Sequence, residues 1–140
     1  MYRHEIGSWG RWSRPERSGQ KNQRPKISYQ GHDPNGIGQH EAGAKLDMGK
    51  NRLGLVSGHF ARALWHVGLV GTYGANKYTD NGWISVADGI NRYSDAGLRH
   101  YLRRMMGEEY DEESKLLHLA HEAWNALAQL ELYLREQEKK

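Results

Sequence analysis

The chain has 140 residues, a net charge of +3 and no cysteine, and 37% of its residues are hydrophobic. This length allows one domain with a modest core, and the lack of cysteine excludes disulfides, thiolate metal sites and a cysteine nucleophile. No apolar run approaches the ~20 residues that cross a bilayer, and the N-terminus lacks an apolar signal region. We therefore expect a cytoplasmic protein that does not contact membranes.

Positive charge gathers at the N-terminus. Residues 1–30 hold seven Lys/Arg and two Asp/Glu, a balance of +5, whereas residues 31–140 hold thirteen and fifteen, a balance of −2. Residues 1–40 are rich in Gly, Pro, Ser, Asn, Gln and Arg and follow no helix or strand period, so we predict a basic, irregular arm there and a folded domain over 41–140. Within the arm, Trp9, Trp12 and Tyr29 leave nucleic-acid binding open beside a merely solvated terminus.

Three segments of the domain have helical periodicity. The first runs from Leu55 to Val70, the second from Asn91 to Met106, and the third from Glu113 to Glu136 with Ser114 or a nearby acid as its cap. Glycines at 71, 74 and 82 predict a loop, GTYGANKYTDNGW, between the first two. No run alternates β-branched residues, so we expect an all-α fold, a small bundle of three to four helices.

The third segment has two distinct faces. Leu and Ala recur at helical spacing on one face, which is typical of a helix that packs on a core, at Leu116, Ala120, Ala123, Leu127, Leu130 and Leu134. His118, His121 and Asn125 share the opposite face. Because Trp124 and Leu132 lie beside this polar seam, we expect it to be partly enclosed, with both histidines directed into one cavity. A solvated face with two ordinary histidines is the alternative.

An acidic loop precedes the third segment, with five acids in the six residues 108–113. Crowded carboxylates repel one another unless cations neutralise them, and hard divalent cations prefer oxygen ligands. Glu108 and Asp111, together with the nearby histidines, therefore indicate a divalent metal site. The alternative is a charged surface loop.

Other residues suit a phosphorylated ligand. Arg99 lies on one face of the second segment with Asp95 and Arg103, and guanidinium groups match phosphate oxygens. The glycine loop contains Lys77, which can neutralise phosphate, and Trp83, which can stack on a base. No Walker A sequence is present.

Five fragments in order, GAKLDMGK, GTYGANKYTDNGW, RYSDAGLRH, GEEYDEES and HLAHEAWNAL, together resemble the phage-encoded dATP/dGTP diphosphohydrolase family. That family is related to the MazG-like all-α nucleoside triphosphate pyrophosphohydrolases. The resemblance covers about residues 40–135. It implies metal-dependent hydrolysis of a deoxynucleoside triphosphate between the α and β phosphates, giving dNMP and pyrophosphate and shaping the phage nucleotide pool. It also implies a homo-oligomer. The alternatives are a nucleic-acid-binding phage protein that uses the arm and a phosphohydrolase that releases triphosphate.

The resemblance also suggests roles for individual residues. Asp95 and Glu108 are the expected catalytic carboxylates. The expected metal ligands are His100, Glu108, Asp111, His118 and His121. The expected substrate-binding residues are Lys45, Asp47, Lys50, Lys77, Tyr78, Asn81, Trp83, Arg99 and Asn125. The cofactor would be Mg²⁺ or Mn²⁺. MazG enzymes bind metal with E-x-x-E and E-x-x-D on two helices, whereas the third segment here reads H-L-A-H, and imidazole ligands favour Mn²⁺ over Mg²⁺.

Overall fold

The computed structural model describes residues 31–139, which divide after Asn51 into two units. Residues 31–51 consist of turns and irregular chain, and the predicted basic arm at residues 1–30 lies outside the described residues. The buried carboxylate of Asp33 organises this unit, because it accepts hydrogen bonds from the backbone N–H groups of Asn35 (2.7 Å) and Lys45 (2.8 Å). These bonds hold the pKa of Asp33 below its ordinary value.

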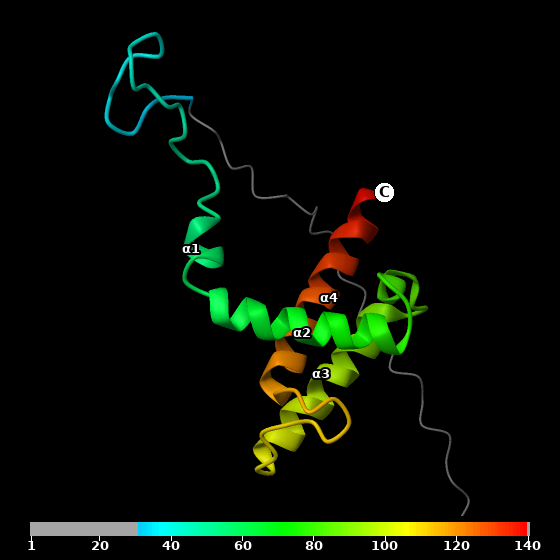
Figure 1. The fold of residues 1–140 in the computed structure, drawn as a ribbon. Helices are drawn as coiled ribbons and strands as arrows, with labels where there is room; N and C mark the ends of the chain where they lie inside the picture. Colours follow the sequence, from blue (N-terminus) through cyan, green and yellow to red (C-terminus); the bar gives the residue numbers. More distant parts are fainter. Residues whose placement is uncertain (1–30, 140) are drawn as a thin grey trace, which may run out of the picture. The chain divides into compact units, whose positions relative to one another are not determined.

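The second unit is helical, which confirms the all-α prediction (Figure 1). Its elements are α1 (Gly54–Ser57), α2 (Ala61–Lys77), the 3₁₀ helix η1 (Gly82–Ser85), α3 (Gly89–Met105) and α4 (His118–Glu138). Extended pairing within residues 31–139 is limited to one isolated bridge between Tyr110 and Leu117. None of the helices in this range is both long and apolar enough to cross a membrane.

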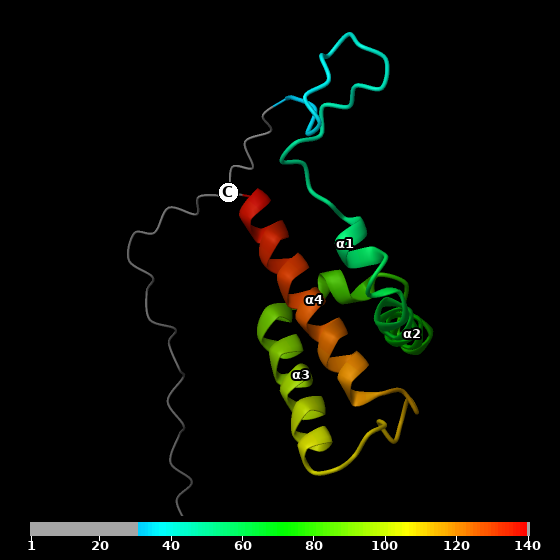
Figure 2. The ribbon, with the colours of Figure 1, turned by 90° about the vertical axis from the view of Figure 1, so that its left-hand side faces the viewer.

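Helices α3 and α4 form an antiparallel hairpin, and α2 crosses it (Figure 2). Glycines allow the close approach of these helices. A Cβ atom at Gly97 would lie 3.3 Å from the Cβ of Asn125, and one at Gly71 would lie 3.3 Å from Nε1 of Trp124. The predicted loop over residues 71–83 is therefore wrong in its first half: Gly71 and Gly74 lie inside α2, where Gly71 makes room for a tryptophan of α4.

The helix boundaries differ from the predictions at two further places. The segment from Leu55 to Val70 is divided into α1 and the first part of α2, whereas the second segment matches α3 closely. The third helix begins at His118 and not at Glu113, and Ser114 does not cap it. The reason is a turn: Asp111 binds the backbone and hydroxyl of Ser114, and Lys115 adopts a left-handed conformation (φ 60°) that a helix does not accept.

Helix α4 buries its polar face and exposes much of its leucine face, which is the reverse of the usual arrangement. The polar seam is buried, with His118, His121 and Asn125 exposed by 7% or less, which confirms that it is enclosed. The leucine stripe does not form the core, because Leu127 and Leu130 keep about half of their surface exposed. Small residues fill the interface, and Gly97 brings α3 directly onto Asn125. Among the described residues, the buried apolar side chains are Val70, Ala120 and Ala128.

Three aromatic rings connect η1, α3 and α4. Trp83 packs edge-on against Tyr93 (ring centroids 6.4 Å apart) and Trp124 (5.7 Å), and the Tyr93 hydroxyl donates to the carbonyl of Trp83 (3.1 Å). Such edge-to-face pairs stabilise beyond the area that they bury. Trp83 is therefore a packing residue of this unit, although it lies in the glycine-rich loop expected to bind a base.

We predict that Trp83→Ala lowers the free energy of unfolding by roughly 2–4 kcal/mol, because it removes a half-buried ring from this cluster. Thermal and urea melts monitored by circular dichroism measure the loss. Tyr78→Ala is the control, because Tyr78 is 74% exposed and its removal should leave the melt almost unchanged. Equal melts for Trp83→Ala and the parent would show that the aromatic cluster contributes little.

Candidate metal centre

Three histidines meet where α3 faces the start of α4. His100 projects from α3, and His118 and His121 project from the first turn of α4. The Nδ1 atoms of His100 and His118 lie 2.8 Å apart, and the rings of His100 and His121 stack at 4.2 Å with an interplanar angle of 10°. The i, i+3 spacing of His118 and His121 on one helix face, which the sequence indicated, places both rings against His100.

His118 has a free binding atom. Its side chain is 2% exposed, and its Nε2 is buried without a hydrogen-bond partner among the described residues. The nearest acidic atom is Oε2 of Glu108, at 3.7 Å, which is too long for a hydrogen bond. A buried polar atom without a partner is costly, so this nitrogen calls for an explanation such as a bound ion.

Asp111 completes a group of three donors. One ligand atom each from His100, Asp111 and His118 can be chosen so that all three lie within 4.8 Å of one another. An ion with ligand bonds of about 2.1 Å keeps neighbouring ligand atoms about 3.0–3.4 Å apart, which lies within this 4.8 Å limit. Two imidazoles and one carboxylate suit a divalent transition ion such as Mn²⁺ better than Mg²⁺. The residues therefore fit a divalent metal.

The protonation states of the group suit metal binding. Burial, reinforced by the neighbouring His121 and His118, lowers the pKa of His100 to about 4, so His100 is neutral at neutral pH. Burial raises the pKa of Asp111, but the two hydrogen bonds from Ser114, together with the nearby His121 and His100, outweigh this effect, and the net shift is downward. An uncharged imidazole and an ionised carboxylate are the forms that bind a cation.

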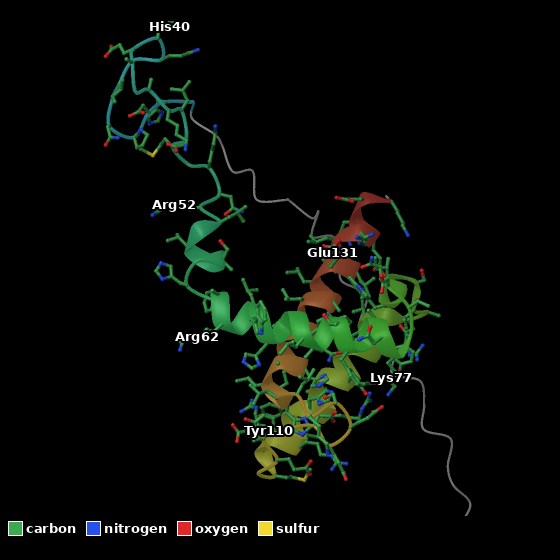
Figure 3. The ribbon with its side chains drawn as sticks, viewed as in Figure 1. His40, Arg52, Arg62, Lys77, Tyr110 and Glu131 are labelled. Atoms are coloured by element: carbon green, nitrogen blue, oxygen red, sulfur yellow. The ribbon has the colours of Figure 1, made fainter. Side chains whose placement is uncertain are left out.

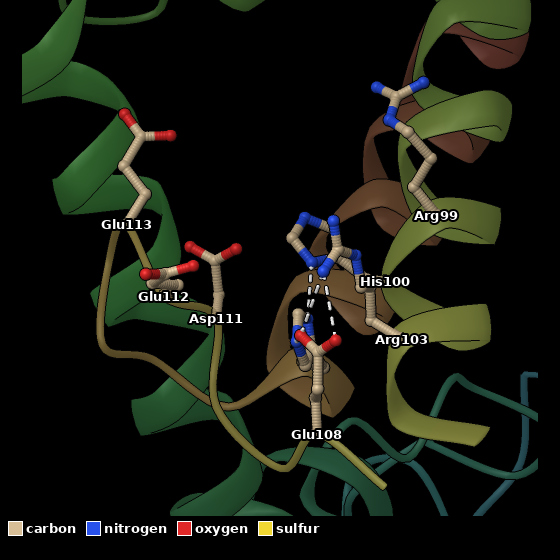
Figure 4. Close-up of a pocket in the computed structure, with 8 residues that line it drawn as sticks. Arg99, His100, Arg103, Glu108, Asp111, Glu112 and Glu113 are labelled. Atoms are coloured by element: carbon tan, nitrogen blue, oxygen red, sulfur yellow. Dashed lines mark hydrogen bonds and ion pairs between the residues drawn. The ribbon is translucent and has the colours of Figure 1, made fainter. Parts of the chain in front are cut away.

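A cavity of about 490 Å³ opens beside this group (Figure 4). Arg99 and Arg103 reach it from α3, while Glu108, Glu112 and Glu113 reach it from the loop that precedes α4. Glu108 accepts hydrogen bonds from Arg103 (3.0 and 3.3 Å). Arg99 forms no ion pair within residues 31–139, so its positive charge is not neutralised by the acidic side chains of the loop. The cavity thus combines a metal-binding edge with a positively charged edge, and its size suits a small ligand.

Several predicted site residues lie outside the cavity lining. Asp95 is exposed on α3, and Asn125 is buried in the helix interface, where its side chain donates to the carbonyl of His121 (2.8 Å). Lys77, at the end of α2 in Figure 3, pairs with Glu113. Lys77 thus contacts Glu113, a residue that lines the cavity. Tyr78 and Asn81 are exposed beyond the end of α2.

The remaining predicted substrate residues belong to the other unit. Lys45, Asp47 and Lys50 lie within residues 31–51, where Lys45 pairs with Asp47 at 3.7 Å. Their predicted substrate-binding role stays a prediction.

Sequence reasoning did not single out Ser114 as a functional residue. The structure places its hydroxyl 2.8 Å from Oδ2 of Asp111 and 2.8 Å from Nε2 of His121. His121, an expected metal ligand, is therefore engaged with Ser114 and stands outside the group of three donors. The available signal was the spacing D-x-x-S, which is typical of a carboxylate that closes a turn onto a serine.

A family model covers the part of the chain that carries this site. A family model described as "dATP/dGTP diphosphohydrolase, N-terminal" matches residues 40–140, a range that contains all the helices and the donor group. No curated protein and no solved structure matches the chain. The match spans well over half of the sequence, so the chain belongs to the dATP/dGTP diphosphohydrolase N-terminal family.

Proposed function

We propose that this protein hydrolyses dATP or dGTP between the α and β phosphates. Water forms a new bond to the α phosphorus, the bond between that phosphorus and the bridging oxygen breaks, and the products are dNMP and pyrophosphate. Such an activity would act on the phage nucleotide pool in the host cytoplasm. Family membership supports the substrate class, and the site geometry supports the chemistry.

The observation that carries the proposal is the donor group with the unpartnered Nε2 of His118. His100, Asp111 and His118 would hold a divalent cation, with Mn²⁺ preferred to Mg²⁺ because two of the three donors are imidazoles. A bound cation would neutralise phosphate oxygens and lower the pKa of a bound water.

The residues around the group supply the other requirements. Arg99 lines the cavity and can bind phosphate oxygens through its planar guanidinium. Glu108 lies between Arg103 and His118, where its carboxylate can accept a proton from the attacking water. Of the two carboxylates expected to be catalytic, we assign this role to Glu108, because Asp95 is not among the residues that line the cavity.

We predict that hydrolysis requires a divalent cation and these donors. A panel of dNTPs and NTPs with Mg²⁺, Mn²⁺ or Co²⁺, analysed by chromatography, should give dNMP and pyrophosphate from dATP or dGTP, and EDTA should abolish the reaction. His118→Ala should lose activity by at least 100-fold, because it removes one of three ligands. His66→Ala is the matched control, because His66 is an exposed histidine on α2.

Two results would contradict the proposal. Undiminished turnover in EDTA would exclude the metal mechanism. Release of nucleoside and triphosphate would place the cleaved bond at the other side of the α phosphorus and would assign a different phosphohydrolase reaction.

We also propose that the protein is a homo-oligomer. Residues 53–76 carry a single charged side chain, Arg62, and they expose large apolar side chains. Those exposed by more than half are Leu53, Leu55, Val56, Phe60 and Trp65. A nearly uncharged apolar surface can meet a second copy of itself without like-charge repulsion, and an exposed patch of this kind is typical of an interface.

Sedimentation velocity tests the homo-oligomer. We expect the parent protein to sediment as a dimer or larger species at micromolar concentration and Trp65→Glu to shift it toward the monomer. Tyr78→Glu, at a similarly exposed aromatic residue outside residues 53–76, should leave the distribution unchanged. A monomeric parent protein would contradict the proposal.

A further inference from the structure

The carboxylate of Asp111 is oriented by a single residue, Ser114. Oδ2 of Asp111 accepts one hydrogen bond from the backbone N–H of Ser114 and another from its hydroxyl, both 2.8 Å long. Two donors on one oxygen fix the plane of the carboxylate and leave Oδ1 as the oxygen without a bond to Ser114. Ser114 therefore decides which way Asp111 faces.

Counting protons at the Ser114 hydroxyl assigns the tautomer of His121. A hydroxyl has one proton, and here it goes to Asp111, which as an ionised carboxylate can only accept. In the 2.8 Å hydrogen bond between Oγ of Ser114 and Nε2 of His121, the proton must then lie on Nε2, and His121 is the donor. The backbone N–H of Leu116 donates to the same oxygen at 3.3 Å, so that Oγ uses its one proton and both lone pairs.

His121 also supports a second member of the donor group. Its ring stacks on the ring of His100, with centroids 4.2 Å apart. Because His121 is 7% exposed and its Nε2 is hydrogen-bonded to Ser114, the ring has a fixed position. One side chain thus contacts His100 directly and reaches Asp111 through Ser114.

We infer that Ser114 and His121 are positioning residues, which hold Asp111 and His100 in the orientation that a divalent cation requires. The inference rests on the proposed function, and it assigns His121 a place behind the ligands instead of among them. Outer hydrogen-bond partners of metal ligands commonly contribute 10- to 100-fold in metal affinity.

Apart from the 3.3 Å bond from the N–H of Leu116, the loop backbone is held by hydrogen bonds that do not involve the Ser114 hydroxyl. The N–H of Asp111 donates to the carbonyl of Leu116 (2.8 Å), and the N–H of Lys115 donates to the carbonyl of Asp111 (2.9 Å). The N–H of His118 donates to the carbonyl of Glu109 (3.0 Å). Removing the hydroxyl should leave these bonds in place, so a Ser114 variant should keep the fold and lose one of the two hydrogen bonds that orient Asp111.

Calorimetric titration with Mn²⁺ at neutral pH, on metal-free full-length protein, tests the inference. We expect Ser114→Ala and His121→Ala to bind Mn²⁺ 10- to 100-fold more weakly than the parent. Ser114→Thr keeps the hydroxyl and should therefore avoid the loss of at least tenfold that follows when such a bond is removed. We expect its affinity to lie within about threefold of the parent. Ser57→Ala is the matched control, because Ser57 is exposed on α1 and bonds only its own helix backbone.

A second measurement needs no variant and no metal. Nitrogen-15 NMR of the histidine rings in the metal-free parent should show the proton of His121 on Nε2. A proton on Nδ1 alone would overturn the chain of hydrogen bonds.

The outcomes separate this inference from the proposed function. If the parent binds Mn²⁺ and Ser114→Ala binds it equally well, the positioning role is wrong while the metal site stands. If the parent binds no Mn²⁺, the metal site itself fails and the proposed function fails with it.

Discussion

The burial of imidazole side chains between α3 and α4 is the constraint on which the rest of this structure depends. His118 and His121 are exposed by 2% and 7%, although an unpaired buried polar group is costly. His121 and His100 have hydrogen-bond partners, in Ser114 and His118, whereas Nε2 of His118 has none among the described residues. An unpartnered buried nitrogen lowers the stability of such an interface, and a bound cation would supply the missing partner.

This constraint explains why the apolar residues of α4 are displaced outward. The histidine face and the leucine face lie on opposite sides of α4. When the histidine face packs against α3, the leucine face points away, and Leu127 and Leu130 remain about half exposed. The apolar side chains of α2 are exposed in the same way, and Trp65 is 73% exposed. Hydrophobic burial within one chain is correspondingly small, and the second copy that we propose would bury more of this apolar surface. The proposed metal site and the proposed oligomer would both follow from the burial of the histidine face of α4.

The sequence predicted the fold class and named the three side chains that converge, and it was wrong where a single side-chain contact overrides a local pattern. Periodicity located α3 and the enclosed seam of α4, because both depend on spacing along one helix. The glycine rule misplaced Gly71, since a glycine that accommodates Trp124 looks the same in sequence as one that breaks a helix. The predicted start of α4 was wrong because Asp111 accepts a hydrogen bond from Ser114 and closes a turn, although several residues of that turn favour helices. His100, Asp111 and His118 were each predicted as ligands, but their convergence depends on the antiparallel pairing of α3 and α4, which no local pattern encodes.

The most direct test of this account is pulsed electron paramagnetic resonance on the Mn²⁺-loaded protein. The electron spin-echo envelope is modulated by nitrogen nuclei bound directly to the ion, so it reports imidazole ligands without any reference to turnover. If His100 and His118 bind the ion, the spectrum shows modulation from two imidazole nitrogens, reduced to one in His118→Ala and unchanged in His66→Ala. Bound Mn²⁺ without nitrogen modulation would place the ion on carboxylates alone and would contradict the assignment of the buried histidines as its ligands.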